Sequence, residues 1–156
     1  MKPLPVSGDL DFALRIVVTL ILAIAIGSER EWHGHAAGIR TMALVGVGAC
    51  IFTAVGLEPI FGNRTDPTRI AAQIVTGVGF LGAGAIFRQG VEVRGLTTAA
   101  SIWVVAAMGM VVGFGYFAIG IFTTVLVLAT LVAIRPLERR LFHHRRAQHD
   151  EEEHFS

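Results

Sequence analysis

The chain has 156 residues, of which 53% are hydrophobic even before its 18 glycines are counted, and only 16% are charged. A soluble domain carries roughly 25% charged residues, and a water-soluble globule of this length could not bury so much apolar surface, so the composition predicts a membrane protein. The formal net charge of +1 gives no field that would attract nucleic acid, and the single cysteine, Cys50, excludes an internal disulfide framework and a zinc site made of cysteines alone.

Stretches without Asp, Glu, Lys or Arg predict five transmembrane helices. The last stretch covers 40 residues, and a helix of that length would reach about 60 Å, about twice the hydrocarbon thickness of a bilayer. It must therefore fold back, and Gly113-Phe114-Gly115-Tyr116 is the expected turn. We expect a compact all-α bundle over 1–135, followed by a charged cytoplasmic tail over 136–156 that is disordered. The five helices are expected at about 10–30, 40–57, 67–87, 96–113 and 116–135.

The first helix is long enough to span a bilayer only if it begins near Asp9, with Asp9 as its N-cap. Asp11 and Arg15 then lie one turn apart, where they can pair near the headgroups while Arg15 extends outward from the helix end. A cleaved signal peptide is the alternative, because Ala23-Ile24-Ala25 resembles a cleavage site. The segment before the apolar run carries one Lys and two Asp, a poor match to a basic leader, so an uncleaved helix is favoured.

The basic residues predict the orientation, because cytoplasmic loops of membrane proteins carry an excess of Lys and Arg. With five helices the two ends of the chain lie on opposite sides, and nine arginines gather on one side against three basic residues on the other. The C-terminus is therefore expected in the cytoplasm and the N-terminus outside. The nine are Arg30, Arg40, Arg88, Arg94, Arg135, Arg139, Arg140, Arg145 and Arg146, and the three are Lys2, Arg64 and Arg69.

Small residues predict how the helices pack, because helices in lipid associate through close backbone approach and interhelical polar contacts. In the third helix Ala72, Thr76, Gly79 and Ala83 fall on one stripe, which we expect to be an interface. Trp103 is expected to pack against the glycine faces. So many glycines would also allow the third helix to be broken or re-entrant, although a continuous helix is favoured. The other glycines expected at helix contacts are Gly77, Gly82, Gly84, Gly109 and Gly113.

Polar residues at the start of the third helix form the first candidate site. Asp66 suits the N-cap and Pro67 the first helical position, while Arg69 and Gln73 lie four apart on one face. A capped helix start with one interhelical hydrogen bond would account for these residues. The functional alternative is a polar site at the outer mouth of the bundle, because polar groups at that depth often mark a pathway.

A cytoplasmic polar cluster is the second candidate, made of Glu29, Arg30, Arg40, Arg88 and Arg94. The positive-inside rule explains the four arginines but not Glu29, which we expect to pair with one of them across the face of the bundle. The sequence leaves open whether this pair only holds helices or also binds a ligand.

The sequence contains no nucleophile–base pair, zinc triad or phosphate loop, so we expect no enzyme and no cofactor. If a metal such as Mg²⁺ binds, Asp66 or Glu29 would supply the oxygen ligand.

Four motifs together resemble the MgtC/SapB family of bacterial inner-membrane proteins, over about residues 24–120. The resemblance implies a multi-pass inner-membrane protein that is not an enzyme, linked to growth in low magnesium and, in pathogens, to survival inside host cells. It also implies a regulatory role that includes restraint of the F-type ATP synthase. Longer members carry a soluble, ACT-like C-terminal domain after the last helix. This sequence has only a short charged tail there, so the resemblance implies nothing about the functions of that domain. The motifs are Glu29-Arg30 with Ala37-Gly38-Ile39-Arg40-Thr41, then Asp66-Pro67-Thr68-Arg69-Ile70-Ala71-Ala72-Gln73, then Gly77-Val78-Gly79-Phe80-Leu81-Gly82-Ala83-Gly84, and Arg94-Gly95-Leu96-Thr97-Thr98-Ala99-Ala100 with Trp103.

Two hypotheses about function follow. The first is a regulatory membrane module that docks on other inner-membrane proteins through glycine-lined faces, with a homo-oligomer compatible with this role. The second is a secondary transporter of Mg²⁺ or another cation, with Asp66, Gln73 or Glu29 as oxygen ligands. The regulator is favoured because only one acidic residue, Glu29, approaches the membrane from inside and no charged residue lies mid-span.

Overall fold

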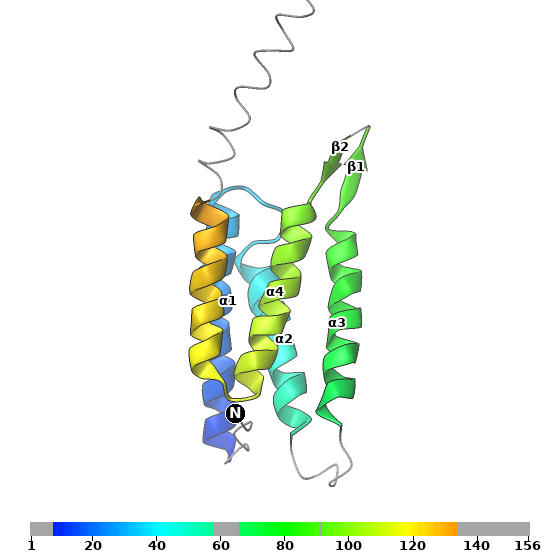
Figure 1. Ribbon diagram of the computed structural model, residues 1–156. Coiled ribbons are helices and arrows are strands. Elements are labelled where there is room, and N and C mark those ends of the chain that lie inside the picture. The colour runs from blue at the N-terminus through cyan, green and yellow to red at the C-terminus, as the bar shows by residue number, and fades with distance from the viewer. Residues whose placement is uncertain (1–7, 58–65, 91, 134–156) are drawn as a thin grey trace, which may run out of the picture. The chain divides into compact units, whose positions relative to one another are not determined.

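The structure is a computed structural model that describes residues 8–57, 66–90 and 92–133. The described residues are helical apart from one small hairpin, which confirms the all-α part of the expected fold class (Figure 1). The elements in chain order are α1 (Asp9–Trp32), α2 (Ile39–Val55), α3 (Pro67–Gly84), β1 (Phe87–Gln89), β2 (Glu92–Arg94), α4 (Leu96–Gly113) and a further apolar helix, Phe117–Ala133.

The chain divides after Thr124 into two units. The first contains α1 to α4, the hairpin and the beginning of the helix Phe117–Ala133. The described part of the second unit, residues 125–133, is the remainder of that helix.

The core of the first unit lies where α2 packs against both α1 and α4. Its fully buried side chains include Ile26 of α1, Met42 of α2 and Val105 of α4. Glycines bring two of these helices close, because a side chain at Gly109 of α4 would strike the backbone of Gly46 of α2. Close backbone approach of this kind is how helices associate in lipid.

The turn after α4 lies where the length of the apolar stretch requires it. A Cβ at Gly113, the last residue of α4, would lie 2.8 Å from the carbonyl oxygen of Cys50, so this end of α4 also needs glycine against α2. Gly115 then adopts a left-handed φ of 86°, its N–H donates to Val112 O, and Tyr116 N–H donates to the α4 backbone five residues earlier. This is the Schellman pattern that ends a helix at a glycine.

The third helix is continuous from Pro67 to Gly84, through all of its glycines. It ends earlier than the expected residue 87, and the short link that we expected after it is a β-hairpin in which Phe87 pairs with Arg94. Gly95, with φ of 89°, carries the chain from the hairpin into α4. A side chain there would strike the carbonyl of Ala85, so the hairpin closes tightly against the end of α3.

The packing of α3 differs from the sequence-based expectation. α3 packs mainly on α4 and lightly on α2, and its buried residues are Ile74, Val78 and Gly82. A Cβ at Gly82 would lie 3.7 Å from Ala99 of α4, so Gly82 is at a helix contact as expected. The predicted stripe is on the exposed side instead, and nothing in the first unit approaches within 4 Å of a Cβ built at Gly77, Gly79 or Gly84. The stripe residues are Ala72, Thr76, Gly79 and Ala83, all exposed.

The expectation for Trp103 is also wrong. This side chain is 50% exposed, and toward α3 it lines a cavity of about 220 Å³ with Ile74, Val75 and Val78 rather than packing on glycines. The reason is the rotation of α3, which turns most of its glycines away from α4.

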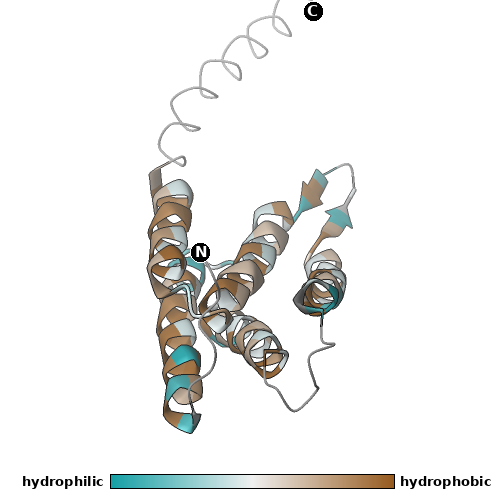
Figure 2. Cartoon of the chain, turned by 60° about the horizontal axis from the view of Figure 1, so that its bottom comes forward, coloured by the Kyte–Doolittle hydropathy of each residue, from teal (hydrophilic) through white to brown (hydrophobic). Residues whose placement is uncertain are grey.

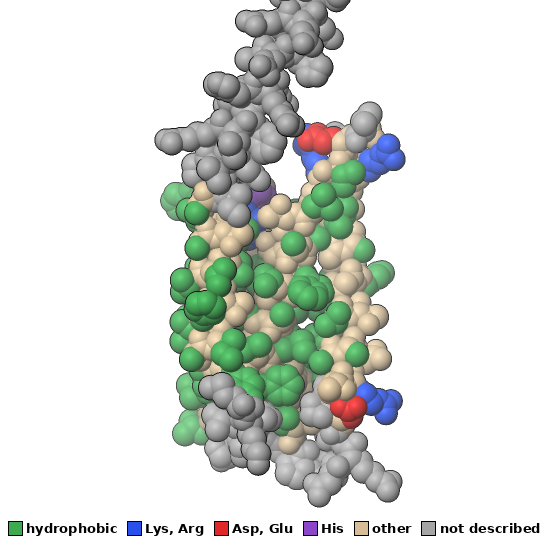
Figure 3. Space-filling model, in the orientation of Figure 1, with side chains coloured by type: hydrophobic (Ala, Val, Ile, Leu, Met, Phe, Trp, Pro, Cys, Tyr) green, Lys and Arg blue, Asp and Glu red, His purple; other side chains and the backbone are tan. Residues whose placement is uncertain are grey.

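The surface suits a membrane. Within the described residues, α1 and α4 are long and apolar enough to cross a bilayer, while α2 and the helix Phe117–Ala133 are shorter apolar helices. Large apolar side chains are exposed along the helices, including Leu44 at 76% and Phe80 at 80%. Figure 2 shows that most helical residues are hydrophobic, and Figure 3 shows hydrophobic side chains spread over the helices on one face. Five membrane crossings and their orientation stay predictions.

Candidate functional site

Asp66 is the N-cap of α3, as the sequence predicts. Its Oδ1 accepts hydrogen bonds from the Thr68 backbone N–H at 2.9 Å and from Thr68 Oγ1 at 2.7 Å. These bonds stabilise the ionised form and lower the pKa of the Asp66 carboxyl, with a smaller contribution from the charge of Arg69. The carboxylate is therefore used to start the helix.

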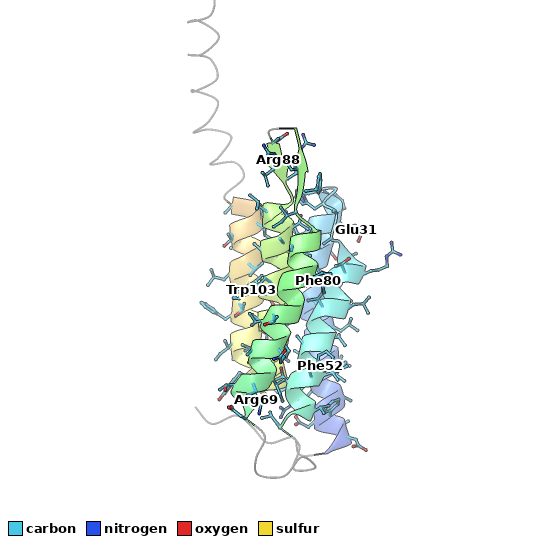
Figure 4. The ribbon with its side chains drawn as sticks, turned by 90° about the vertical axis from the view of Figure 1, so that its right-hand side faces the viewer. Glu31, Phe52, Arg69, Phe80, Arg88 and Trp103 are labelled. Carbon is cyan, nitrogen blue, oxygen red and sulfur yellow. The ribbon has the colours of Figure 1, made fainter. Side chains whose placement is uncertain are left out.

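Arg69 and Gln73 lie one turn apart and are exposed near the beginning of α3, and Figure 4 shows Arg69 at this end of the helix. The interhelical hydrogen bond expected here is absent from the described residues, since neither side chain bonds another described side chain. Instead both residues line one groove between α2 and α3. The structure thus brings Arg69 and Gln73 together, with Asp66 as the neighbouring cap.

The groove between α2 and α3 has a volume of about 790 Å³ and is apolar apart from Arg69 and Gln73. The two helices meet at Gly56, where a side chain would strike Ile70. Sequence reasoning missed this groove, because it depends on the separation of two helices rather than on any local pattern. Its other lining residues are Leu44, Val45, Gly48, Ala49, Phe52, Val55, Gly56, Ile70, Ile74, Gly77, Val78 and Leu81.

Two residues of the predicted cytoplasmic cluster, Glu29 and Arg30, form a buried ion pair. Arg30 Nε lies 2.9 Å from Glu29 Oε2, and their side chains are 1% and 8% exposed. Glu29 Oε1 also lies 3.2 Å from Nδ1 of His33, the C-cap residue of α1. Glu29 therefore pairs with one of the arginines of the predicted cluster, its neighbour Arg30 on the same helix, and a pair across the face of the bundle stays a prediction.

The other three arginines of that cluster are exposed, unlike Arg30. Arg40 is exposed near the beginning of α2. Arg88 and Arg94 belong to the hairpin, where Arg88 donates to Gly90 O at 2.9 Å and Arg94 Nη2 lies 2.9 Å from Glu92 Oε2. The structure thus divides the predicted cluster into a buried Glu29–Arg30 pair and three exposed arginines.

The two carboxylates considered as metal ligands lie at opposite ends of the helices. Asp66 starts α3, whereas Glu29 lies near the end of α1, at the end of the unit that carries the hairpin (Figure 1). Each already accepts hydrogen bonds or an ion pair. Within the described ranges, no three His, Cys, Asp or Glu side chains gather as a metal site would require.

Arg15 is a buried polar centre that the sequence reading placed wrongly. Its Nη2 lies 2.8 Å from Asp11 Oδ2, which confirms the predicted pairing. The side chain is 1% exposed, however, and its Nη1 donates to Gly113 O at 2.6 Å. Arg15 therefore points inward and satisfies a carbonyl at the end of α4 that lacks a partner within its own helix. Asp9, expected to be the N-cap, is the first residue of α1, and Gly8 takes the cap position without a side-chain bond.

Glu31 supplies a second contact that sequence reasoning missed. Its Oε2 accepts a hydrogen bond from the Ile39 backbone N–H at 2.9 Å, so the end of α1 caps the beginning of α2. A side chain at Gly38 would strike Glu31. Glu31 and Ile39 are eight residues apart, a spacing that matches no local capping motif, so the sequence did not predict this hydrogen bond.

Comparison with known proteins supports one family. The model of the MgtC family matches residues 16–140. The putative magnesium transporter YhiD of Escherichia coli strain K12 is 44% identical over 137 residues, which cover 84% of this chain and 64% of that protein. Protein MgtC of Salmonella typhimurium strain LT2 is 41% identical over 130 residues, which cover 83% of this chain and 55% of that protein. The chain thus spans between about half and two thirds of these relatives, and no solved structure matches it.

Proposed function

Because the chain belongs to the MgtC family, we propose that it is a non-catalytic, multi-pass regulator of the bacterial inner membrane that supports adaptation to low magnesium. It acts by docking on other membrane proteins, and the F-type ATP synthase is the proposed partner.

The outward face of α3 is the observation that carries this proposal. Ala72, Thr76, Gly79 and Ala83 recur along it at helical spacing, all four are exposed, and the opposite side of α3 packs on α4. We call these four residues the outer α3 face. Thr76 Oγ1 donates to Ala72 O, within the helix, at 2.9 Å, so the hydroxyl of this face has its hydrogen-bond partner inside α3.

A face of small residues lets the backbone of another transmembrane helix approach closely, and this approach is a main source of helix association in lipid. The two buried arginines of the helices serve internal contacts, since Arg15 pairs with Asp11 and Arg30 with Glu29. This division favours a docking module over a pathway for ions.

Bulky substitutions on the outer α3 face test the proposal. Ala72→Leu and Ala83→Leu should leave membrane levels near those of the parent, because both sites are exposed. They should abolish growth in low magnesium of a strain that depends on this protein, and should reduce co-purification of the ATP synthase about tenfold. Ala13→Leu on α1 and Ala100→Leu on α4, also exposed, are matched controls and should behave like the parent. Parental growth and parental co-purification in both face variants would reject this surface.

Transport is the second candidate, because one relative at 44% identity is named a putative magnesium transporter. Asp66, Gln73 or Glu29 would then supply oxygen ligands. Liposomes that contain the purified protein and an internal magnesium indicator distinguish the two functions. The regulator predicts uptake equal to protein-free liposomes, whereas uptake that falls in Glu29→Gln or Asp66→Asn would establish transport.

A further inference from the structure

The α2–α3 groove has the dimensions of a lipid site. Its volume of about 790 Å³ falls within the roughly 300–1,000 Å³ of small-molecule pockets. Along α3 it extends from Arg69 to Leu81, a rise of about 18 Å at about 1.5 Å per residue. Half of a hydrocarbon core is about 15 Å, so the groove is as long as one leaflet is deep.

Glycines widen the groove from both sides. Gly48 lines it from α2 and Gly77 from α3. A Cβ built at either position meets nothing within 4 Å. The space is therefore real room beside the two backbones, bounded by apolar side chains such as Phe52 and Leu81.

The polar groups of the groove are confined to one end. Arg69 and Gln73 are on its rim near the beginning of α3, and Figure 4 shows Arg69 at this end of the helix, far from Arg88 in the hairpin. The Asp66 carboxylate is engaged by Thr68 at 2.7 and 2.9 Å, which leaves the Arg69 guanidinium exposed without a hydrogen bond to a described side chain. A guanidinium binds a phosphate through paired hydrogen bonds, and Gln73 can donate a further one.

We propose that the groove binds one phospholipid from the leaflet at the Arg69 end, with an acyl chain between α2 and α3 and the phosphate on Arg69. A free anion would use only the rim, and an apolar helix would leave Arg69 unused. A phospholipid uses both, because it joins a phosphate to an apolar chain of one-leaflet length. This site faces α2 and is separate from the outer α3 face, so it goes beyond the proposed docking function.

Lipid retention by the purified chain tests the proposal. The protein is isolated in mild detergent, washed, and incubated with dioleoylphosphatidylglycerol, dioleoylphosphatidylethanolamine, dioleoylglycerol or glycerol phosphate, and bound lipid is counted by native mass spectrometry. We expect one molecule of either phospholipid per chain. Dioleoylglycerol, which lacks the phosphate, should be retained at least about tenfold less, and glycerol phosphate should not be retained.

Variants separate the two halves of the site. Gly48→Leu and Gly77→Leu should fold, since their side chains enter open space, and should remove the bound phospholipid by filling the groove. Arg69→Gln should weaken phospholipid retention about tenfold without changing that of dioleoylglycerol. Gly79→Leu, also in open space but on the outer α3 face, is the control and should retain the lipid while it tests docking.

Three results would overturn the proposal. One is full phospholipid retention in both Gly48→Leu and Gly77→Leu, and another is equal retention of phospholipid and dioleoylglycerol by the parent. The third is a dimeric parent protein together with a monomeric Gly48→Leu variant that retains as much lipid as the parent, because a second copy of the chain would then occupy the groove.

Discussion

At the scale of single residues, Arg15 shows how a buried charge can hold helices together. Its guanidinium bonds Asp11 on the same helix and the carbonyl of Gly113 at the end of α4. The end of a helix carries partial negative charge on its free carbonyls, so a cation is favourable there. Arg15 therefore links the beginning of α1 to the turn that follows α4.

We expect Arg15→Met to destabilise the protein by about 1.5–3 kcal/mol, because a buried carbonyl would lose its charged donor. Arg15→Lys should be intermediate, since an ammonium cannot reproduce the guanidinium fork. Asp11→Asn should be milder, because the Asp11 side chain is 23% exposed and water can replace part of the bond. Thermal unfolding in detergent, followed by size-exclusion chromatography, gives the ranking. An Asp11 variant less stable than Arg15→Met would contradict the interhelical role.

Asp66 predicts a pH effect. Its pKa is lowered by the hydrogen bonds from Thr68, so its stabilising contribution is complete above the unfolded-state pKa of about 3.9. That contribution is lost as the pH falls through the lower folded-state value. Asp66→Asn should therefore keep nearly parental stability at pH 7, because Asn caps a helix about as well as Asp, and should lose less stability than the parent below about pH 4.

Melting temperatures measured from about pH 7 to about pH 3 test this difference. Asp66→Leu is the control, since it removes the cap at every pH and should be less stable than either protein throughout the neutral range. Parallel pH curves for the parent and Asp66→Asn would show that the Asp66 charge contributes nothing to the helix start.

At the scale of helices, glycine has different roles on α3 and α4: on α4 it allows close packing against α2, and on α3 it lies on an exposed face. Gly109 faces the backbone of Gly46 across the α2–α4 contact, whereas Gly79 faces open space. The same Gly-to-Ala substitution should thus act through overpacking at one site and through helix propensity at the other.

We expect Gly109→Ala to cost about 1–3 kcal/mol, because α2 and α4 must separate to admit the methyl group. Gly79→Ala should be neutral or stabilising by up to about 1 kcal/mol, because Ala is the better helix former. Urea or thermal unfolding of the two variants in the same detergent makes the comparison. If Gly79→Ala were as damaging as Gly109→Ala, the outer α3 face would be packed in the purified protein.

At the scale of the whole molecule, the hairpin and the beginning of α3 mark opposite ends of the first unit (Figures 1 and 4). Arg69 and Arg88 are exposed at these two ends. The single cysteine, Cys50, is buried. A Cys50→Ala variant therefore has no native thiol, and any labelling reports only on a cysteine introduced into it.

In that background we expect Arg69→Cys to react with a membrane-impermeant maleimide on intact spheroplasts. Arg88→Cys should react only after the membrane is permeabilised, because the excess of arginine places the hairpin in the cytoplasm. The labelled fraction is read by a mass shift on a gel. Reaction of both cysteines from outside would reject a spanning unit, and the inverse pattern would reverse the orientation.

Features that depend on near neighbours in the chain could be predicted from the amino-acid pattern alone. These are the apolar stretches that become helices, the Asp66 cap, the Gly113–Tyr116 turn and the Asp11–Arg15 pair. Each depends on residues within about one or two helical turns, so spacing and residue type suffice to predict it.

Three features depend on how the helices pack and could not be predicted from local patterns: the buried face of α3, the direction of the Arg15 side chain, and the groove between α2 and α3. In water the apolar side of a helix identifies its buried face, but in lipid an apolar side chain is equally stable against a neighbouring helix or an acyl chain. Ile74 and Val78 of α3 are buried while Val75 and Phe80 are exposed, and hydrophobicity does not separate the two pairs. The inward direction of Arg15 has a similar cause, because its partner is a backbone carbonyl 98 residues away, on a helix end that only folding brings beside α1.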